Sequence, residues 1–343
     1  MAQQADHALP AVSVVICHHA GRLLEGCLET LKTSQGVTYE IIVITSDASY
    51  DTPRTDIHLV RAQGGPAQKR NLGTLIAKHP IVIYIDDDAE VSPYTLYNFW
   101  RGFQVHPEAG MLFARIYNGE RRDELDDCGS WLTPTGFLYA RASRLRLPDA
   151  ELLRPTRCLA SKSAGCAIRR ATFYNVGQFD PTYFILGEET DLAWRVWLRG
   201  QEVWYWPDAV LWHYFNTSKK PTQDYYSLTR IHRYGARNYV NCLLTNLGAL
   251  RLWAILPGHV LAWLLAALGF LARGQSTRGA LVLQGLWDAL IGLPSTWDKR
   301  RHVQGTRRVT DRWLLHPDRA GHRPPLSYYP RRLVQYIWNG LHG

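Results

Sequence analysis

Apolar, β-branched runs alternate with helical patterns near the start of the chain, and this order limits the fold more than any other feature. The strand-like runs cover residues 11–17, 40–45, 57–61 and 81–85, and the helical patterns cover residues 23–31 and 67–78. Strands that follow one another through helices pair in parallel, so the sequence predicts an α/β fold with a doubly wound sheet. No Gly-x-Gly-x-x-Gly follows the first run, which argues against a dinucleotide site.

Three consecutive carboxylates, Asp86, Asp87 and Asp88, come directly after the run at 81–85. Adjacent anions at the end of a buried strand repel one another unless a cation lies among them. Ligands also bind at this edge of open α/β sheets. Hard oxygen ligands with room for phosphates suit Mg²⁺ or Mn²⁺ better than Zn²⁺. The alternative is an acidic strand-to-loop turn with no function.

A second acidic group, Glu188, Glu189 and Asp191, follows Gly187 at the start of a helical pattern. The helix dipole explains acids in a first turn, and this is the structural alternative to a functional role. Three acids in four residues exceed what a helix start needs. A carboxylate near a helix N-terminus is also expected to stay ionised at neutral pH, which suits a general base.

Most of the net charge of +9 and the longest apolar segment both lie in the C-terminal region. Residues 294–343 hold 10 Lys and Arg against 3 Asp, and residues 252–272 carry no formal charge. This segment is just long enough to span a bilayer. Its Pro-Gly at 257–258 also fits an interfacial hairpin with residues 281–293 as the second arm, and a buried core helix is the third reading. Without a nucleic-acid-binding motif, the basic tail favours anionic lipid over nucleic acid.

Six motifs, taken together in their order and spacing, resemble those of family 2 glycosyltransferases. They are VSVVI (12–16), EIIVITSDASYD (40–51), GPAQKRNLG (65–73), IDDD (85–88), VGQFD (176–180) and EETDL (188–192). The resemblance covers roughly residues 11 to 246. Within the family, DCGSWLTPTG (127–136) and the segment 225–246 are similar to those of bacterial rhamnosyltransferase-type members.

The resemblance implies a GT-A fold, which is Rossmann-like with a mostly parallel sheet flanked by helices. Residues 1–10 are an N-terminal tail, 11–118 the nucleotide-sugar-binding half and 119–246 the acceptor-binding and catalytic half. Residues 247–343 form a hydrophobic and basic helical region. The irregular stretch at 119–162 is expected to shape the acceptor site and exclude water.

Site residues are carried over from the family by matching positions. Asp86 and Asp88 match the motif that holds the ribose and the metal-bound diphosphate, with Asp88 the direct metal ligand and Asp87 beside the donor. Arg70 and Asn71 match an Arg-Asn pair that lines the nucleotide or diphosphate pocket. His213 matches a histidine that completes the metal site in some members, although a lone His is often structural.

Two positions depart from the family pattern. Glu189 occupies the place of the aspartate that usually acts as the base, so that Glu189, Glu188 and Asp191 are all candidates for this role. Ser46-Asp47 stands where the family usually has Asp-Asn or Asp-Asp. In that pattern the first Asp binds the N3–H of a uracil or thymine ring. Asp47 is expected to act from the next position, with a UDP- or dTDP-sugar favoured as the donor.

These features predict a metal-dependent, inverting hexosyltransferase that uses Mn²⁺ or Mg²⁺. Its acceptor is a glycan or lipid-linked glycan in cell-surface polysaccharide synthesis. The expected location is the cytoplasmic face of the inner membrane, as a peripheral or integral protein; no nucleic-acid partner is expected. The alternatives are a polyprenyl-phosphate glycosyltransferase and a catalytically silent carbohydrate-binding scaffold of the same fold.

Overall fold

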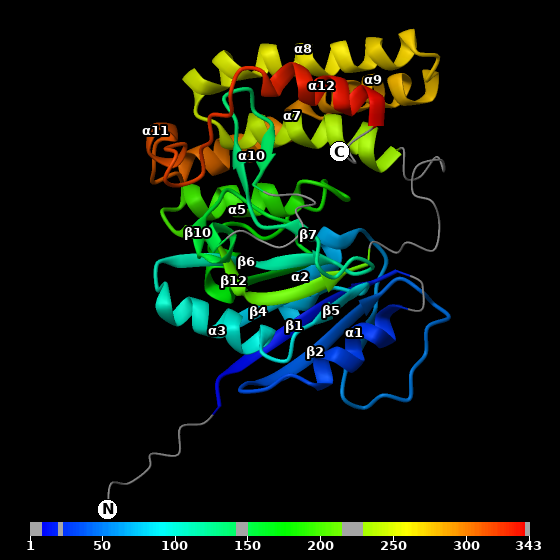
Figure 1. Ribbon diagram of the computed structural model, residues 1–343, viewed down its shortest axis with the longest axis vertical. Helices are drawn as coiled ribbons and strands as arrows, with labels where there is room; N and C mark the ends of the chain where they lie inside the picture. Colours follow the sequence, from blue (N-terminus) through cyan, green and yellow to red (C-terminus); the bar gives the residue numbers. More distant parts are fainter. Residues whose placement is uncertain (1–8, 20–22, 142–149, 215–228, 340–343) are drawn as a thin grey trace, which may run out of the picture.

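A computed structural model describes residues 9–19, 23–141, 150–214 and 229–339, and ten of its described strands build one large sheet (Figure 1). In chain order they are β1 (Ala11–His18), β2 (Thr38–Thr45), β3 (His58–Arg61), β4 (Ile81–Asp86), β5 (Ala89–Val91), β6 (Ala109–Asn118), β7 (Leu125–Asp127), β10 (Thr156–Arg157), β11 (Gly165–Arg169) and β12 (Glu202–His213). The order across the sheet is β10-β12-β6-β11-β4-β1-β2-β3, with β5 paired to β12 and β7 paired to β6.

The N-terminal half of the sheet is parallel, as the sequence predicts. β1 lies between β2 and β4 and is parallel to both, and β2 is parallel to β3. The predicted bounds of these strands and of their two helices agree with the structure within two residues at each end. β11 enters antiparallel between β4 and β6, while β12 runs parallel to β6. The expected mostly parallel α/β sheet is therefore confirmed, with an antiparallel strand near its centre.

Helices cover both faces of the sheet and form two apolar cores. On one face, α1 (Leu23–Lys32) and α3 (Thr95–Val105) pack through residues such as Leu28 and Phe99. On the other face lie α2 (Pro66–Ile76), α4 (Arg170–Asn175) and α5 (Glu188–Leu198). Trp194, Trp197, Trp204 and Trp206 are buried in these cores. These four tryptophans therefore fill the interior and are not available to stack on a sugar.

The stretch expected to be irregular, residues 119–162, contains short elements in its described part. Besides β7 and β10, they are β8 (Ser130–Leu132), β9 (Leu138–Ala140) and the 3-10 helix η1 (Ala150–Leu153). β8 and β9 form a separate hairpin. Elements of two to four residues are too short to show a periodicity, and the sequence therefore predicts a loop here.

Helices form the C-terminal layer, which Figure 1 places above the sheet. The π-helical turn η2 (Thr229–Tyr234) leads into α7 (Gly235–Asn246), so the family-like segment 225–246 is helical from residue 229 on, and its first four residues lie outside the described residues. Then follow α8 (Ala249–Ala272), α9 (Ser276–Ile291), α10 (Leu293–Gly305), α11 (Asp311–Leu314) and α12 (Tyr328–Asn339).

α8 and α9 form a helical hairpin whose turn follows Ala272, with Pro257 inside the first helix. Pro257 lies on the exposed side of α8, and the helix continues through it. In the described part of the chain, α8 is the one helix long and apolar enough to cross a membrane, and 33% of its most apolar window is buried.

Candidate active site

Asp86, Asp88 and His213 converge at the carboxyl end of β4. Asp86 ends β4, and the antiparallel pairing of β12 with β5 places His213 opposite Ala89, the residue after Asp88. His213 Nε2 lies 3.1 Å from Asp88 Oδ1 and 3.9 Å from Asp86 Oδ2. One ligand atom from each of the three residues lies within 4.8 Å of the others. Two carboxylates and an imidazole fit a divalent cation such as Mn²⁺.

A further carboxylate, Asp126, stands behind His213 and was missed by the sequence reasoning. Its Oδ2 lies 3.8 Å from His213 Nδ1, and its Oδ1 accepts a hydrogen bond from Lys162 Nζ at 2.6 Å. Burial lowers the pKa of His213, but Asp88, Asp126 and Asp86 outweigh it and raise the pKa to about 10. A carboxylate on the far ring nitrogen is the usual support of a metal-binding histidine, because it fixes the ring orientation.

Arg70 joins the aspartates to the second acidic group. It lies buried on α2 and donates hydrogen bonds to Asp86 Oδ1 at 3.0 Å and to Glu188 Oε1 at 2.8 Å. The sequence places Arg70 in the nucleotide or diphosphate pocket, and the structure places it between the predicted metal ligands and the predicted base. Its charge therefore compensates two carboxylates that burial would otherwise destabilise.

The three acids at the start of α5 have different surroundings. Glu188 is buried against Arg70, whereas Glu189 is partly exposed. Asp191 is 2% exposed, pairs with Arg195 at 2.7 Å and accepts a hydrogen bond from Asn246 Nδ2 at 2.8 Å. These partners make Asp191 an anchor of α5 and leave Glu189 as the acid with access to a substrate.

Although Glu189 is partly exposed, the protein around its carboxyl group removes water from it, and this desolvation, followed by the neighbouring Glu188, raises the pKa of Glu189 well above its ordinary value. This differs from the expectation that an acid at a helix start stays ionised, because loss of water and a like charge outweigh the helix dipole. A glutamate that holds its proton to higher pH is also a stronger base once it is ionised.

The segment before Glu188 has a constrained backbone. Gln178 and Leu186 have positive φ angles of 62° and 69°, which non-glycine residues rarely adopt. Asn71 holds this segment through both atoms of its side-chain amide, which bond the carbonyl and the N–H of Phe179 at 2.9 and 3.0 Å. The sequence places Asn71 in the nucleotide pocket, whereas in the structure its amide supports the backbone near the acids.

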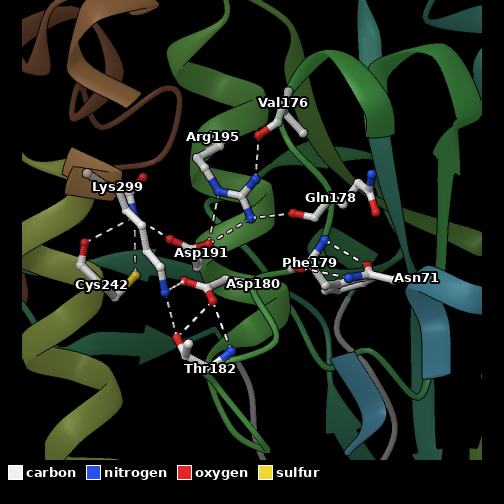
Figure 2. A network of polar contacts seen from close by, with 11 residues as sticks. Asn71, Val176, Gln178, Phe179, Asp180, Thr182, Asp191, Arg195, Cys242 and Lys299 are labelled. Carbon is white, nitrogen blue, oxygen red and sulfur yellow. Dashed lines mark hydrogen bonds and ion pairs between the residues drawn. The ribbon is translucent and has the colours of Figure 1, made fainter. Parts of the chain in front are cut away.

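Residues of the C-terminal layer hold the same segment (Figure 2). Lys299 of α10 donates hydrogen bonds to Asp180 Oδ2 at 2.6 Å and to Thr182 Oγ1 at 2.8 Å. Asn238 of α7 donates to the carbonyls of Ile185 and Leu186 at 2.9 and 2.6 Å. The positions of Glu188 and Glu189 therefore depend on helices that follow them in the chain.

The residues expected to bind the donor base, Ser46 and Asp47, lie directly after β2. Ser46 Oγ contacts Lys69 Nζ and His19 Nδ1, each at 2.9 Å. Asp47 Oδ1 accepts hydrogen bonds from the N–H and the hydroxyl of Ser49, and these bonds lower the pKa of Asp47. Lys69, which is 4% exposed, was not singled out from the sequence, and its Nζ donates a hydrogen bond to Ser46 Oγ.

Asp87 faces away from His213 and pairs with His18 of β1, whose Nδ1 lies 2.8 Å from Asp87 Oδ2. Burial raises the pKa of Asp87, and the bond to His18 opposes this shift. The three consecutive aspartates therefore have three different partners, namely Arg70, His18 and His213. This division reduces the repulsion that the sequence predicts among them.

Comparison with known proteins gives three findings. Residues 13–151 match the family model described as Glycosyl transferase family 2. The uncharacterized protein MT1568 of Mycobacterium tuberculosis (strain CDC 1551 / Oshkosh) is 29% identical over 149 residues, which cover 40% of this chain and 44% of that protein. The structure of the mannosyltransferase PcManGT from Pyrobaculum calidifontis matches with a TM-score of 0.52 and 15% identity, over 83% of this chain and 88% of that chain. The last match confirms the predicted fold class.

Proposed function

Because the chain is a member of glycosyl transferase family 2, we propose that it is a metal-dependent, inverting enzyme that moves a sugar from a nucleotide-sugar donor to a hydroxyl group. The observation that carries this proposal is the convergence of Asp86, Asp88 and His213 at one end of the Arg70 bridge, with Glu188 and Glu189 at the other. A cation site beside a candidate base is what such a reaction requires.

The donor is a nucleoside diphosphate sugar. PcManGT was solved in complex with GDP-Man and Mn²⁺, which supports a nucleotide sugar and a divalent cation for this chain as well. Asp86, Asp88 and His213 would hold Mn²⁺ or Mg²⁺, which stabilises the charge that develops on a leaving diphosphate. Asp47 beside Ser46 supports a UDP- or dTDP-sugar, since its carboxylate accepts hydrogen bonds from N–H groups.

Glu189 takes the role of the base. The acceptor oxygen forms a bond to the anomeric carbon while the bond from that carbon to the diphosphate oxygen breaks. The acceptor proton passes to the Glu189 carboxylate. Glu188 and Arg70 position this acid: Arg70 neutralises Glu188, and Glu188 in turn keeps the pKa of Glu189 high.

For the acceptor, we propose a glycan or lipid-linked glycan of a cell-surface polysaccharide, with the enzyme at the cytoplasmic face of the inner membrane. A second candidate is transfer to a polyprenyl phosphate, whose oxygen carries no proton and needs no base. The raised pKa of Glu189 is the observation that favours this alternative. Full activity of Glu189→Gln would select it.

The first experiment is a titration of the full chain with UDP, dTDP and GDP, with and without Mn²⁺, followed by thermal unfolding. We expect one nucleotide to raise the unfolding temperature only when Mn²⁺ is present, and Asp88→Asn to abolish this response. If no nucleotide stabilises the protein under either condition, the proposed donor site is wrong and the silent-scaffold reading is favoured.

A further inference from the structure

The outward face of α8 is apolar along its whole length. Trp253, Pro257, Leu261, Leu264, Leu268 and Leu271 recur every three or four residues and are all exposed. Leu268 is 60% exposed and Trp253 is 66% exposed. A surface helix in water carries polar residues on this face, because its apolar stripe packs inward. We name these six residues the outer stripe of α8.

The helices beside α8 continue the apolar surface. Leu283, Trp287, Leu290 and Ile291 of α9 are exposed, as are Val334 and Trp338 of α12. α9 and α12 both contact α8, and Figure 1 shows the three helices at the end of the molecule away from the sheet. Exposed apolar side chains gathered on three neighbouring helices are typical of a surface that binds a partner or a membrane.

The opposite face of α8 is fixed to the protein. Leu252 and Ile255 belong to the core that also holds α5 and α7, and Trp263, Ala266, Ala267 and Phe270 pack with residues of α9 and α12. The buried positions therefore run from one end of the helix to the other. α8 lies flat on the protein, and crossing a bilayer would expose this entire packed face.

The charge of the chain is concentrated in the same region. Residues 247–343 contain 13 Lys and Arg against 4 Asp, a net charge of +9, whereas residues 1–246 contain 26 basic and 26 acidic residues. Arg251 and Arg273 stand at the two ends of the outer stripe, and Arg331 is exposed on α12. Arg273 also stacks 3.9 Å from the Trp338 ring. Basic residues around an apolar face attract anionic lipid headgroups.

We propose that α8, α9 and α12 form an interfacial docking surface for an anionic phospholipid bilayer. The outer stripe of α8 enters the headgroup region, while the arginines contact the lipid phosphates. The docking is monotopic: α8 lies in the plane of the membrane and does not cross it. This inference rests on the proposed location at the membrane and deepens it, because it names the docking surface, the lipid class and the orientation; it is tested without nucleotide or acceptor, so its failure would leave the proposed transfer reaction standing.

The test is flotation of the full-length protein with vesicles of phosphatidylcholine alone or with phosphatidylglycerol added. We expect the protein to float with the anionic vesicles and at least about tenfold less with the neutral ones. The variant Leu264→Glu/Leu268→Glu should lose binding, and Arg251→Gln/Arg331→Gln should weaken it and reduce its salt dependence. Val105→Glu, at a 53% exposed position at the end of α3, is the matched control.

Three results overturn the proposal. The first is a failure of the flotation test itself. Either the wild-type protein floats with neither kind of vesicle, or Leu264→Glu/Leu268→Glu floats as well as the wild type. Another is that the protein in lipid-free solution is a stable dimer that this variant converts to monomers, because a second copy then covers the surface. The third is resistance of the bound protein to alkaline extraction, which indicates a span. Unchanged unfolding temperatures in lipid-free buffer without nucleotide show that the variants are folded.

Discussion

Arg70 and Glu188 are 118 positions apart in the chain, and their side chains meet at 2.8 Å in the interior of the protein. Both side chains are 4% exposed, so each charge depends on the other for compensation. The same guanidinium also bonds Asp86. This contact ties α2, in the N-terminal half of the fold, to the helix that carries the candidate base.

Replacing Arg70 by Met leaves Glu188 buried without its cation. We expect the free energy of unfolding to fall by about 3–5 kcal/mol, because breaking a buried ion pair leaves an uncompensated charge. The measurement is denaturant unfolding of the full chain. The double variant Arg70→Met/Glu188→Gln is expected to recover much of this loss but not transferase activity. Equal losses in the single and double variants would show that the pair is not coupled.

Metal binding and proton transfer are separable by two substitutions. Asp88→Ala is expected to abolish both transfer and Mn²⁺-dependent nucleotide binding, whereas Glu189→Gln abolishes transfer and retains the binding. Calorimetric titration with nucleotide and Mn²⁺, together with a transfer assay, distinguishes the two. Retention of most of the activity by Glu189→Gln would remove it from the role of base.

Asp126→Asn tests the support of His213. We expect the affinity for Mn²⁺ to fall about 10- to 100-fold, because the imidazole loses the carboxylate that orients it. Exposed Asp123, changed to Asn, is the control for a lost charge on the same segment. Similar affinities in both variants would mean that Asp126 has no part in the site.

Lys299→Met tests whether the C-terminal layer positions the acid pair. Burial opposes ionisation of Asp180, but the bonds from Lys299 and Thr182 outweigh it and lower the pKa. The stabilisation is therefore complete above the ordinary value of 3.8 and is lost as the pH falls through the lower folded value. With Lys299 31% exposed, we expect a loss of about 1 kcal/mol at neutral pH.

The stability difference between wild type and Lys299→Met should therefore disappear in acid. The same variant should lower kcat and leave the KM for the donor nearly unchanged. The reason is that Lys299 bonds Asp180 and Thr182 and not the residues proposed to bind the donor. Lys299→Arg keeps the charge and is expected to restore part of both properties. A stability difference that persists below the pKa of Asp180 would contradict the assignment.

The pH dependence of transfer should show the environment of Glu189. Because burial and Glu188 raise its pKa, the rate is expected to rise with pH along a limb that lies well above the ordinary value of 4.5. Glu188→Gln removes the like charge and should move this limb to lower pH. Profiles of kcat/KM from about pH 5 to about pH 9 provide the measurement. A limb that stays in place or moves upward would exclude this coupling.

The parallel half of the sheet could be predicted because its strands and helices are long enough to show their periodicities. The meeting of the aspartates with His213 was also within reach, since it follows from positions at strand ends and from the family resemblance. The strands between residues 119 and 162 could not be found, because two or three residues carry no periodic signal.

The roles of individual acids and amides were harder to predict, because each role depends on partners far away in the chain. Asp191 is held by Asn246, which is 55 positions away in the chain. Asn71 bonds the backbone of Phe179, which is 108 positions away. Asp126 was overlooked for the same reason, since only the fold brings it beside His213. The Asp126-Asp127 pair was the one available signal.

The packing of Leu252 and Ile255 into the main core has a consequence for folding. The helical layer and the sheet share one interior, so they are expected to unfold in a single cooperative transition. A truncation after residue 246 would expose that interior and so would not yield a soluble catalytic domain. Because the two parts unfold together, a membrane that binds α8 only in the folded protein also stabilises the distant aspartates against unfolding.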